Sequence, residues 1–171
     1  LASVVFSERG FVDDNSQSLQ QALPDTYFDD IRWDTPRSEI EKRHDYKASD
    51  QNESIVIYLD RLAGHAVQKW YHFDEHGQFV MGYYVFQEEN QRTVAAYEKV
   101  KKSMEDTYGK PAKEVTDWKD ETYRDDPKQW NRAVALGHLV LMSSWEKEKS
   151  TIVLLQSMQN NEQDLTIMFQ K

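Results

Sequence analysis

The sequence predicts an α+β fold in which helices pack on one face of an antiparallel sheet. Runs rich in β-branched and aromatic residues are joined by short links, which favour antiparallel pairing. A long segment, Arg92 to Tyr108, instead repeats its apolar residues at helical spacing. The order of helix, three strands, helix and four strands also fits one helix-plus-sheet unit used twice, over residues 31–89 and 90–171, although the two stretches share no long matching sequence.

Residues 1–30 are interpreted as an N-terminal arm in front of a single domain over residues 31–171. The chain does not begin with methionine, and residues 1–6 fit either a first strand or the tail of an export signal. A short helix is expected from Ser16 to Leu23, where the following proline ends it.

A second short helix is expected after Trp33, ending near His44. Thr35 can accept hydrogen bonds from free amides at the start of this helix. Pro36 is allowed at the first helical position, and Glu39 is favourable in the first turn.

Three strands are expected next, from Ser54 to Leu62, from Val67 to Phe73 and from Phe79 to Phe86. The turn residues 74–77, with the sequence Asp-Glu-His-Gly, predict that the last two strands form a hairpin.

Both faces of this hairpin are largely apolar. With residues 74–77 as the turn, one face pairs Trp70 with Met81 and His72 with Phe79. The other face carries Tyr71, Phe73, Val80, Tyr84 and Phe86. A sheet covered by helices on one side needs a single apolar face, so the second face must bury something else or present an aromatic surface to a partner.

The helix from Arg92 to Tyr108 is ended by Gly109 and Pro111. A strand from Glu114 to Trp118 and a polar loop over residues 119–129 follow. The chain then ends in a meander whose expected strands are Ala133 to Trp145, Thr151 to Met158 and Asp164 to Phe169.

One face of the meander is expected to be core, and the other mixes hydroxyls with apolar residues. The expected core face carries Met142, Ile152, Leu154, Ile167 and Phe169. The other face carries Leu141, Ser143, Thr151, Val153, Leu155, Ser157, Asp164, Thr166 and Met168. Because the hairpin has large aromatic residues where this second face has hydroxyls, residues 66–86 are the best candidate for a functional surface.

Composition excludes several classes of function. The net charge is −9 and the pI is about 5.0, which opposes binding to nucleic acid. The absence of cysteine excludes disulfide frameworks, thiolate nucleophiles and thiolate metal sites. No apolar run approaches the roughly 18 to 20 residues of a membrane-spanning helix, so no transmembrane segment is expected.

Signatures of catalysis are weak. Residues 72–76 read His-Phe-Asp-Glu-His, the inverted zinc-protease pattern, but that chemistry needs a helix and this segment is expected to be a hairpin turn. No metal site, catalytic residue or cofactor is therefore assigned. Asp60 and Asp117, the latter beside Trp118, are the remaining candidates for a carboxylate and aromatic pocket, against the simpler interpretation of solvated acids.

Four sequence features together resemble a family of uncharacterised bacterial proteins, many of them exported or lipid-anchored. These are Ile31-Arg32-Trp33-Asp34-Thr35 before a short helix, Tyr71-His72-Phe73-Asp74 in a hairpin, Tyr108-Gly109-Lys110-Pro111 at a helix end, and Ser144-Trp145 closing a late strand. Family members often carry glycine where this chain has Asp34. The helix-plus-sheet order is also similar to the β-lactamase-inhibitor-protein architecture and to small outer-membrane assembly lipoproteins.

The resemblance implies a non-enzymatic bacterial protein, of the periplasm or cell envelope, that binds a protein partner; a cytoplasmic location is the alternative. The expected binding residues are Trp70, His72, Tyr84, Phe86 and Trp118, weighed against their use as core. The alternative function is an enzyme or small-ligand receptor with a pocket built from Asp60, Asp117, Trp118 and His72. The oligomeric state is left open.

Overall fold

The computed structural model describes residues 19, 22–24, 27–159 and 162–171. In chain order the helices are η1 (Phe28–Asp30), α2 (Arg37–Glu41), η2 (Glu89–Gln91), α3 (Val94–Tyr108), η3 (Pro127–Gln129) and α4 (Trp130–Ala135). The strands are β1 (Asp50–Gln51), β2 (Ile55–Leu62), β3 (His65–Phe73), β4 (Phe79–Phe86), β5 (Lys113–Trp118), β6 (Leu139–Glu146), β7 (Thr151–Gln159) and β8 (Glu162–Gln170). The two alternatives for residues 1–6 lie outside the described residues, as does most of the helix expected from Ser16 to Leu23.

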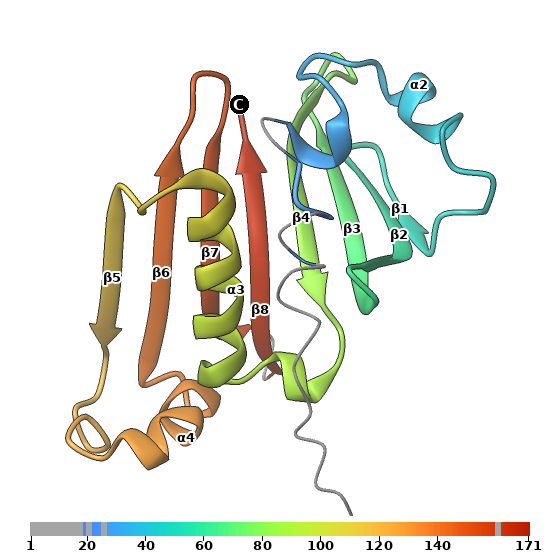
Figure 1. The fold of residues 1–171 in the computed structure, drawn as a ribbon. Coiled ribbons are helices and arrows are strands. Elements are labelled where there is room, and N and C mark those ends of the chain that lie inside the picture. The colour runs from blue at the N-terminus through green and yellow to red at the C-terminus, as the bar shows by residue number, and fades with distance from the viewer. Residues whose placement is uncertain (1–18, 20–21, 25–26, 160–161) are drawn as a thin grey trace, which may run out of the picture.

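Within the described residues, eight strands form one antiparallel sheet, so the predicted α+β class is confirmed. The strand order is β1-β2-β3-β4-β8-β7-β6-β5, which places two meanders side by side and joins them where β4 pairs with β8 (Figure 1). Helices α3 and α4 pack on one face of the β6–β8 half of the sheet. We call this side of the whole sheet the covered face. The division into two repeated units remains a prediction.

Helix α3 follows its predicted amphipathic pattern. It begins after Thr93, whose side-chain oxygen accepts a hydrogen bond from the backbone amide of Ala96 at 3.1 Å. It ends at Gly109, whose φ of 83° lies in the region that favours glycine. Its buried stripe includes Tyr97 and Met104, which face the sheet.

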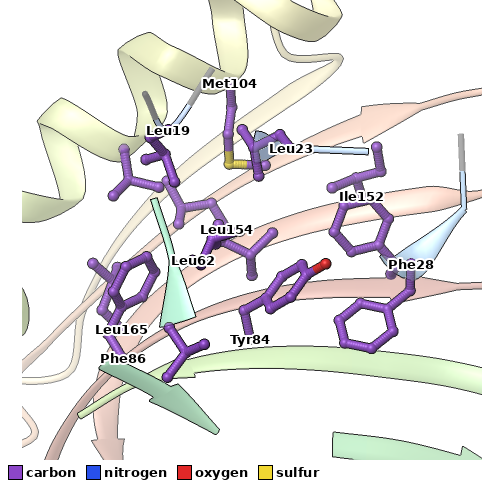
Figure 2. Packing of buried hydrophobic residues seen from close by; sticks show 14 of the residues in the cluster. Leu19, Leu23, Phe28, Leu62, Tyr84, Phe86, Met104, Ile152, Leu154 and Leu165 are labelled. Carbon is purple, nitrogen blue, oxygen red and sulfur yellow. The ribbon is translucent and has the colours of Figure 1, made fainter. Parts of the chain in front are cut away.

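The core lies between the covered face, helix α3 and the segment that precedes α2 (Figure 2). Phe28 is fully buried, and its ring centroid lies 4.5 Å from that of Tyr84. A Cβ atom at position 82 would overlap the Phe28 ring, so this strand position requires glycine. Leu19 and Leu23 are also buried in this core, which shows that part of the expected N-terminal arm packs against the sheet.

The predicted register of the β3–β4 hairpin is wrong by two residues for its outer pairs. Trp70 pairs with Tyr83 and His72 pairs with Met81, while Phe79 lies opposite Phe73 on the covered face. One residue of this error comes from the link, which is one residue longer than expected because Phe73 pairs with Phe79. The other comes from a register shift between His72 and Phe73, where Val80 is an extra residue in β4. A bulge of this kind moves all later partners without leaving a clear sign in the sequence.

The predicted faces of β6 are also wrong. Glu146 pairs directly with Thr151, so the turn is one residue shorter than expected and every β6 side chain changes face. Met142 therefore leaves the expected core face, and Ser143 with Leu141 joins the covered face. The Ser143 hydroxyl is satisfied there by the Tyr97 hydroxyl at 2.8 Å.

Three local expectations near helices need correction. Thr35 does not cap α2; its hydroxyl donates to the backbone oxygen of Arg32 at 2.8 Å, and α2 begins at Arg37 after Pro36. Helix α2 ends at Glu41, before the expected His44. Residues 133–135, expected to begin a strand, belong to α4, where Ala133 and Val134 are fully buried. Burial against the sheet explains why this apolar stretch resembled a strand.

Candidate functional site

The side of the sheet opposite to α3 and α4 is partly exposed, and we call it the open face. Successive strands align its side chains in rows. One row runs from Trp70 through Tyr83 and Met168 to Val153. The next row runs from Gln68 through Val85 and Thr166 to Leu155. The centre of the open face is therefore mostly apolar and aromatic, with Gln68 and Thr166 as polar members, although no described helix packs on it.

A hollow of about 390 Å³ lies on the open face, where β4 and β8 join the two halves of the sheet. It is lined by Gln68, Trp70, His72, Tyr83, Val85, Gln87, Arg92, Leu155, Glu162, Asp164, Thr166 and Met168. The lining residues come from β3, β4, β7 and β8, together with Gln87 and Arg92 from the link that follows β4.

Three rings form an aromatic wall at one end of the hollow: Trp70, His72 and Tyr83. The Trp70 and His72 rings are nearly parallel at 6.2 Å between centroids, and the Tyr83 ring meets His72 edge-on at 5.0 Å. The indole N–H of Trp70 donates to the side-chain oxygen of Gln68 at 2.8 Å, which directs the indole along the strand and over the hollow. All three rings are only partly buried, so they remain accessible to a ligand.

His72 is a neutral group in this wall. Burial lowers the pKa of His72 below its usual value of 6.5. Its Nε2 atom is buried and has no hydrogen-bond partner among the described residues. Above neutral pH the imidazole therefore contributes an aromatic surface and one unused polar atom, with no positive charge.

The opposite end of the hollow is polar and holds Arg92. The Arg92 Nε donates to the backbone oxygen of Phe86 at 3.1 Å, and Nη2 donates to that of Gln87 at 2.9 Å. The remaining nitrogen, Nη1, lies 3.3 Å from a carboxylate oxygen of Glu162. The guanidinium is thus held in place by the end of β4 and is mostly buried.

Asp164 lines the same polar end but forms no hydrogen bond or ion pair with the described residues. Burial raises the pKa of this carboxyl above its usual value, and the opposing effect of the Arg92 charge is smaller. The Asp164 carboxylate is only partly buried, so it remains open to a hydrogen-bond donor or a cation that enters this end of the hollow.

Two of the five predicted binding residues, Trp70 and His72, line the hollow. The expectation that Tyr84 and Phe86 contribute to an accessible surface is wrong, because they lie on the covered face with exposed fractions of 1% and 0%. Trp118 lies on β5, at the far edge of the sheet, where its ring packs edge-on against Trp130 at 5.6 Å.

The sequence interpretation missed Tyr83, Arg92 and Asp164 as residues of this site. Tyr83 could have been found, since strand alternation with the correct register places it beside Trp70. Arg92 and Asp164 carried no such signal, because they reach the hollow through the pairing of β4 with β8, which are distant in sequence.

The four residues of the expected catalytic pocket are not brought together. Asp60 forms an ion pair with Lys69 on the covered face at 2.9 Å, whereas His72 lies on the open face. Asp117 is near Lys119 and Trp118 at the β5 edge. His72 is the second-last residue of β3 and His76 lies in the following turn, so the inverted zinc-protease pattern has no helix here. Within the described part of the chain, no three potential metal ligands cluster.

A second polar cluster lies on the covered face, around Lys69. Its ammonium group lies 2.8 Å from an oxygen of Asp29 and 2.9 Å from an oxygen of Asp60. The other oxygen of Asp29 accepts a hydrogen bond from the Tyr71 hydroxyl at 2.7 Å. Asp29 has a φ of 52°, so these bonds also hold a left-handed backbone conformation. The cluster satisfies its own charges and fixes the segment before α2 to the sheet.

Comparisons of the chain with family models, with curated proteins and with solved structures found no match. Among the described residues, no helix combines the length and apolar character needed to cross a membrane.

Proposed function

We propose that this chain is a non-enzymatic binding protein that contacts a protein partner through the open face, centred on the hollow. The observation that carries the proposal is the aromatic wall of Trp70, His72 and Tyr83, partly exposed beside an apolar floor of Val85 and Leu155. Tryptophan and tyrosine on a rigid surface are the residues that dominate binding energy at protein interfaces.

The arrangement of polar groups favours binding over catalysis. His72 pairs with Met81, and Met81 pairs with Gln170 at the last position of β8. Asp164 is near the first position of the same strand. A separation of six strand positions is roughly 20 Å, so these two groups cannot share a proton. The carboxylate and the imidazole are therefore better placed to contact different parts of a ligand.

A location in the bacterial envelope is part of the same proposal. It is supported by the resemblance of residues 31–35, 71–74, 108–111 and 144–145 to exported and lipid-anchored proteins. Fractionation of the native host, with immunodetection of the chain in envelope and cytosolic fractions, tests this location separately from binding.

Cross-linked affinity capture from the native host tests the binding proposal. We expect a stoichiometric partner with the wild-type chain and a loss of at least tenfold with the double variant Trp70→Ala/Tyr83→Ala, because hot-spot truncations cost about 2 kcal/mol or more each. Leu136→Ala is the matched control, since Leu136 is an exposed apolar residue outside the open face. Equal recovery by wild type and the double variant would contradict the proposal.

A small-ligand receptor is the second candidate function. The hollow, at about 390 Å³, is within the size range of small-molecule sites, and it combines apolar walls with a few polar groups. A thermal-shift screen with sugars, amines and nucleotides tests it. Stabilisation that disappears in the double variant Trp70→Ala/Tyr83→Ala would favour this function over a protein partner.

A further inference from the structure

The polar end of the hollow limits which partner can cover the open face. Asp164 and Glu162 supply two carboxylates against the single guanidinium of Arg92. Each Arg92 nitrogen already has an acceptor, in the backbone oxygens of Phe86 and Gln87 and in Glu162. Among the described residues, Asp164 is therefore the charge at this end that has no partner.

Any partner that covers the hollow removes water from Asp164. An apolar or anionic group at that position would leave a buried carboxylate without a partner. The desolvation of that carboxylate would then weaken binding, because no new hydrogen bond or ion pair would offset it. A cation offsets this cost by pairing with Asp164. The whole chain, at a net charge of −9, attracts a basic partner over longer distances.

The floor next to Asp164 suits an aliphatic chain. Thr166 lies two residues along β8 from Asp164 on the same face, roughly 7 Å away, and aligns with Val85 and Leu155 on the neighbouring strands. Lysine and arginine side chains match an apolar floor that ends at a carboxylate. Each has an aliphatic stem of several carbons, which can be buried along apolar surface, and a cation at its end.

We propose that the hollow receives a lysine or arginine side chain of a protein partner, with its aliphatic stem over Val85 and Leu155 and its cation at Asp164. This inference rests on the proposed function, because it names the chemistry by which the same surface recognises its partner.

Peptide selection tests the inference without knowledge of the natural partner. A phage-displayed library of random peptides is selected on the wild-type chain and depleted on the double variant Trp70→Ala/Tyr83→Ala, so that only peptides dependent on the aromatic wall are retained. We expect these peptides to be enriched in lysine and arginine. Replacing the key basic residue of a synthetic peptide by norleucine should weaken binding to wild type about tenfold.

A double-mutant cycle then locates the cation. The same norleucine replacement should cost less than about twofold on Asp164→Asn, because the interacting charge is already absent. Asp117→Asn is the matched control: Asp117 lies on the open face of β5, outside the hollow, and this variant should behave as wild type. If Asp164→Asn does not fold, Asp164→Ser takes its place in the double-mutant cycle.

The outcomes separate the two proposals. Retained peptides without basic enrichment, or a cation effect that persists in Asp164→Asn, would overturn the inference and leave the binding function standing. A lysine derivative with a free side-chain amine, Nα-acetyl-lysine amide, is measured as well. If it alone binds as tightly as the peptides, the inference is overturned in favour of a small amine ligand. If no selected peptide depends on Trp70 and Tyr83, the proposed function fails and the inference fails with it.

Discussion

The two faces of the β3–β4 hairpin have similar composition and opposite roles. Tyr83 and Tyr84 are consecutive, yet Tyr83 lines the hollow on the open face whereas Tyr84 is buried against Phe28 on the covered face. Trp70 and Tyr71 are separated in the same way. The comparison shows that the role of an aromatic residue is decided by what covers its face, and not by its type or its neighbours in sequence.

The charged groups of the two faces differ in a similar way. On the covered face, Lys69 is placed between the carboxylates of Asp29 and Asp60, so each charge has a partner. On the open face, Asp164 is partly desolvated and has no partner among the described residues. A polar cluster that satisfies itself stabilises a fold, whereas a polar group left unsatisfied at a surface hollow is available to a ligand.

The largest expected effect separates the two tyrosines. Tyr84→Ala should lower the free energy of unfolding by about 3–5 kcal/mol, because it removes a fully buried ring from the core. Tyr83→Ala, its matched control, should cost about 1 kcal/mol or less, since its ring is only partly buried. Urea denaturation of both variants measures the difference. Equal losses would show that the open face is as much a part of the core as the covered face.

The next effect tests the charge cluster on the covered face. Lys69→Met should cost about 2 kcal/mol at neutral pH, because it leaves Asp29 and Asp60 close together without the cation. Lys119→Met removes an exposed ion pair with Asp117 and should cost less than about 0.5 kcal/mol. Urea denaturation of both variants at the same pH measures the two losses in the free energy of unfolding. A cost for Lys69→Met no larger than that for Lys119→Met would show that the cluster does not hold the segment before α2.

Sequence patterns were sufficient for the elements and insufficient for their pairing. Alternation and helical spacing located β2, β4 and α3 to within about two residues, because these signals are local. The register of the hairpin depended on two residues, Gln78 in the link and Val80 in the bulge, and it was missed. The faces of β6 depended on one residue, Glu146, which pairs with Thr151 and does not belong to the turn.

The candidate site was predicted in part for the same reason. Alternation showed that the hairpin has two apolar faces, and Trp70 with His72 was correctly placed on one of them. It could not show which face α3 and Phe28 cover, so Tyr84 and Phe86 were assigned to the surface. Asp164 joins the hollow only through the pairing of β8 with β4, a long-range contact that no local pattern contains.

The smallest expected effect compares a histidine from each face. Burial lowers the pKa of His44, which stacks on Tyr58 at 3.7 Å on the covered side, and burial also lowers the pKa of His72 on the open face. In both cases the unfolded chain binds a proton more readily than the folded one. The stability that each neutral ring supports is therefore complete above the ordinary pKa of 6.5 and is lost as the pH falls toward the lowered folded pKa.

Urea denaturation of His44→Phe and His72→Phe between pH 7.5 and about 5.5 checks this effect. We expect each variant to lose less stability on acidification than wild type, by an amount below the effect of Lys69→Met. His76→Phe is the control for the replacement of a histidine by phenylalanine, because His76 is an exposed residue of the turn. If His44→Phe flattens the curve and His72→Phe does not, the open face is wetter than its geometry indicates, and its imidazole is not held neutral by burial.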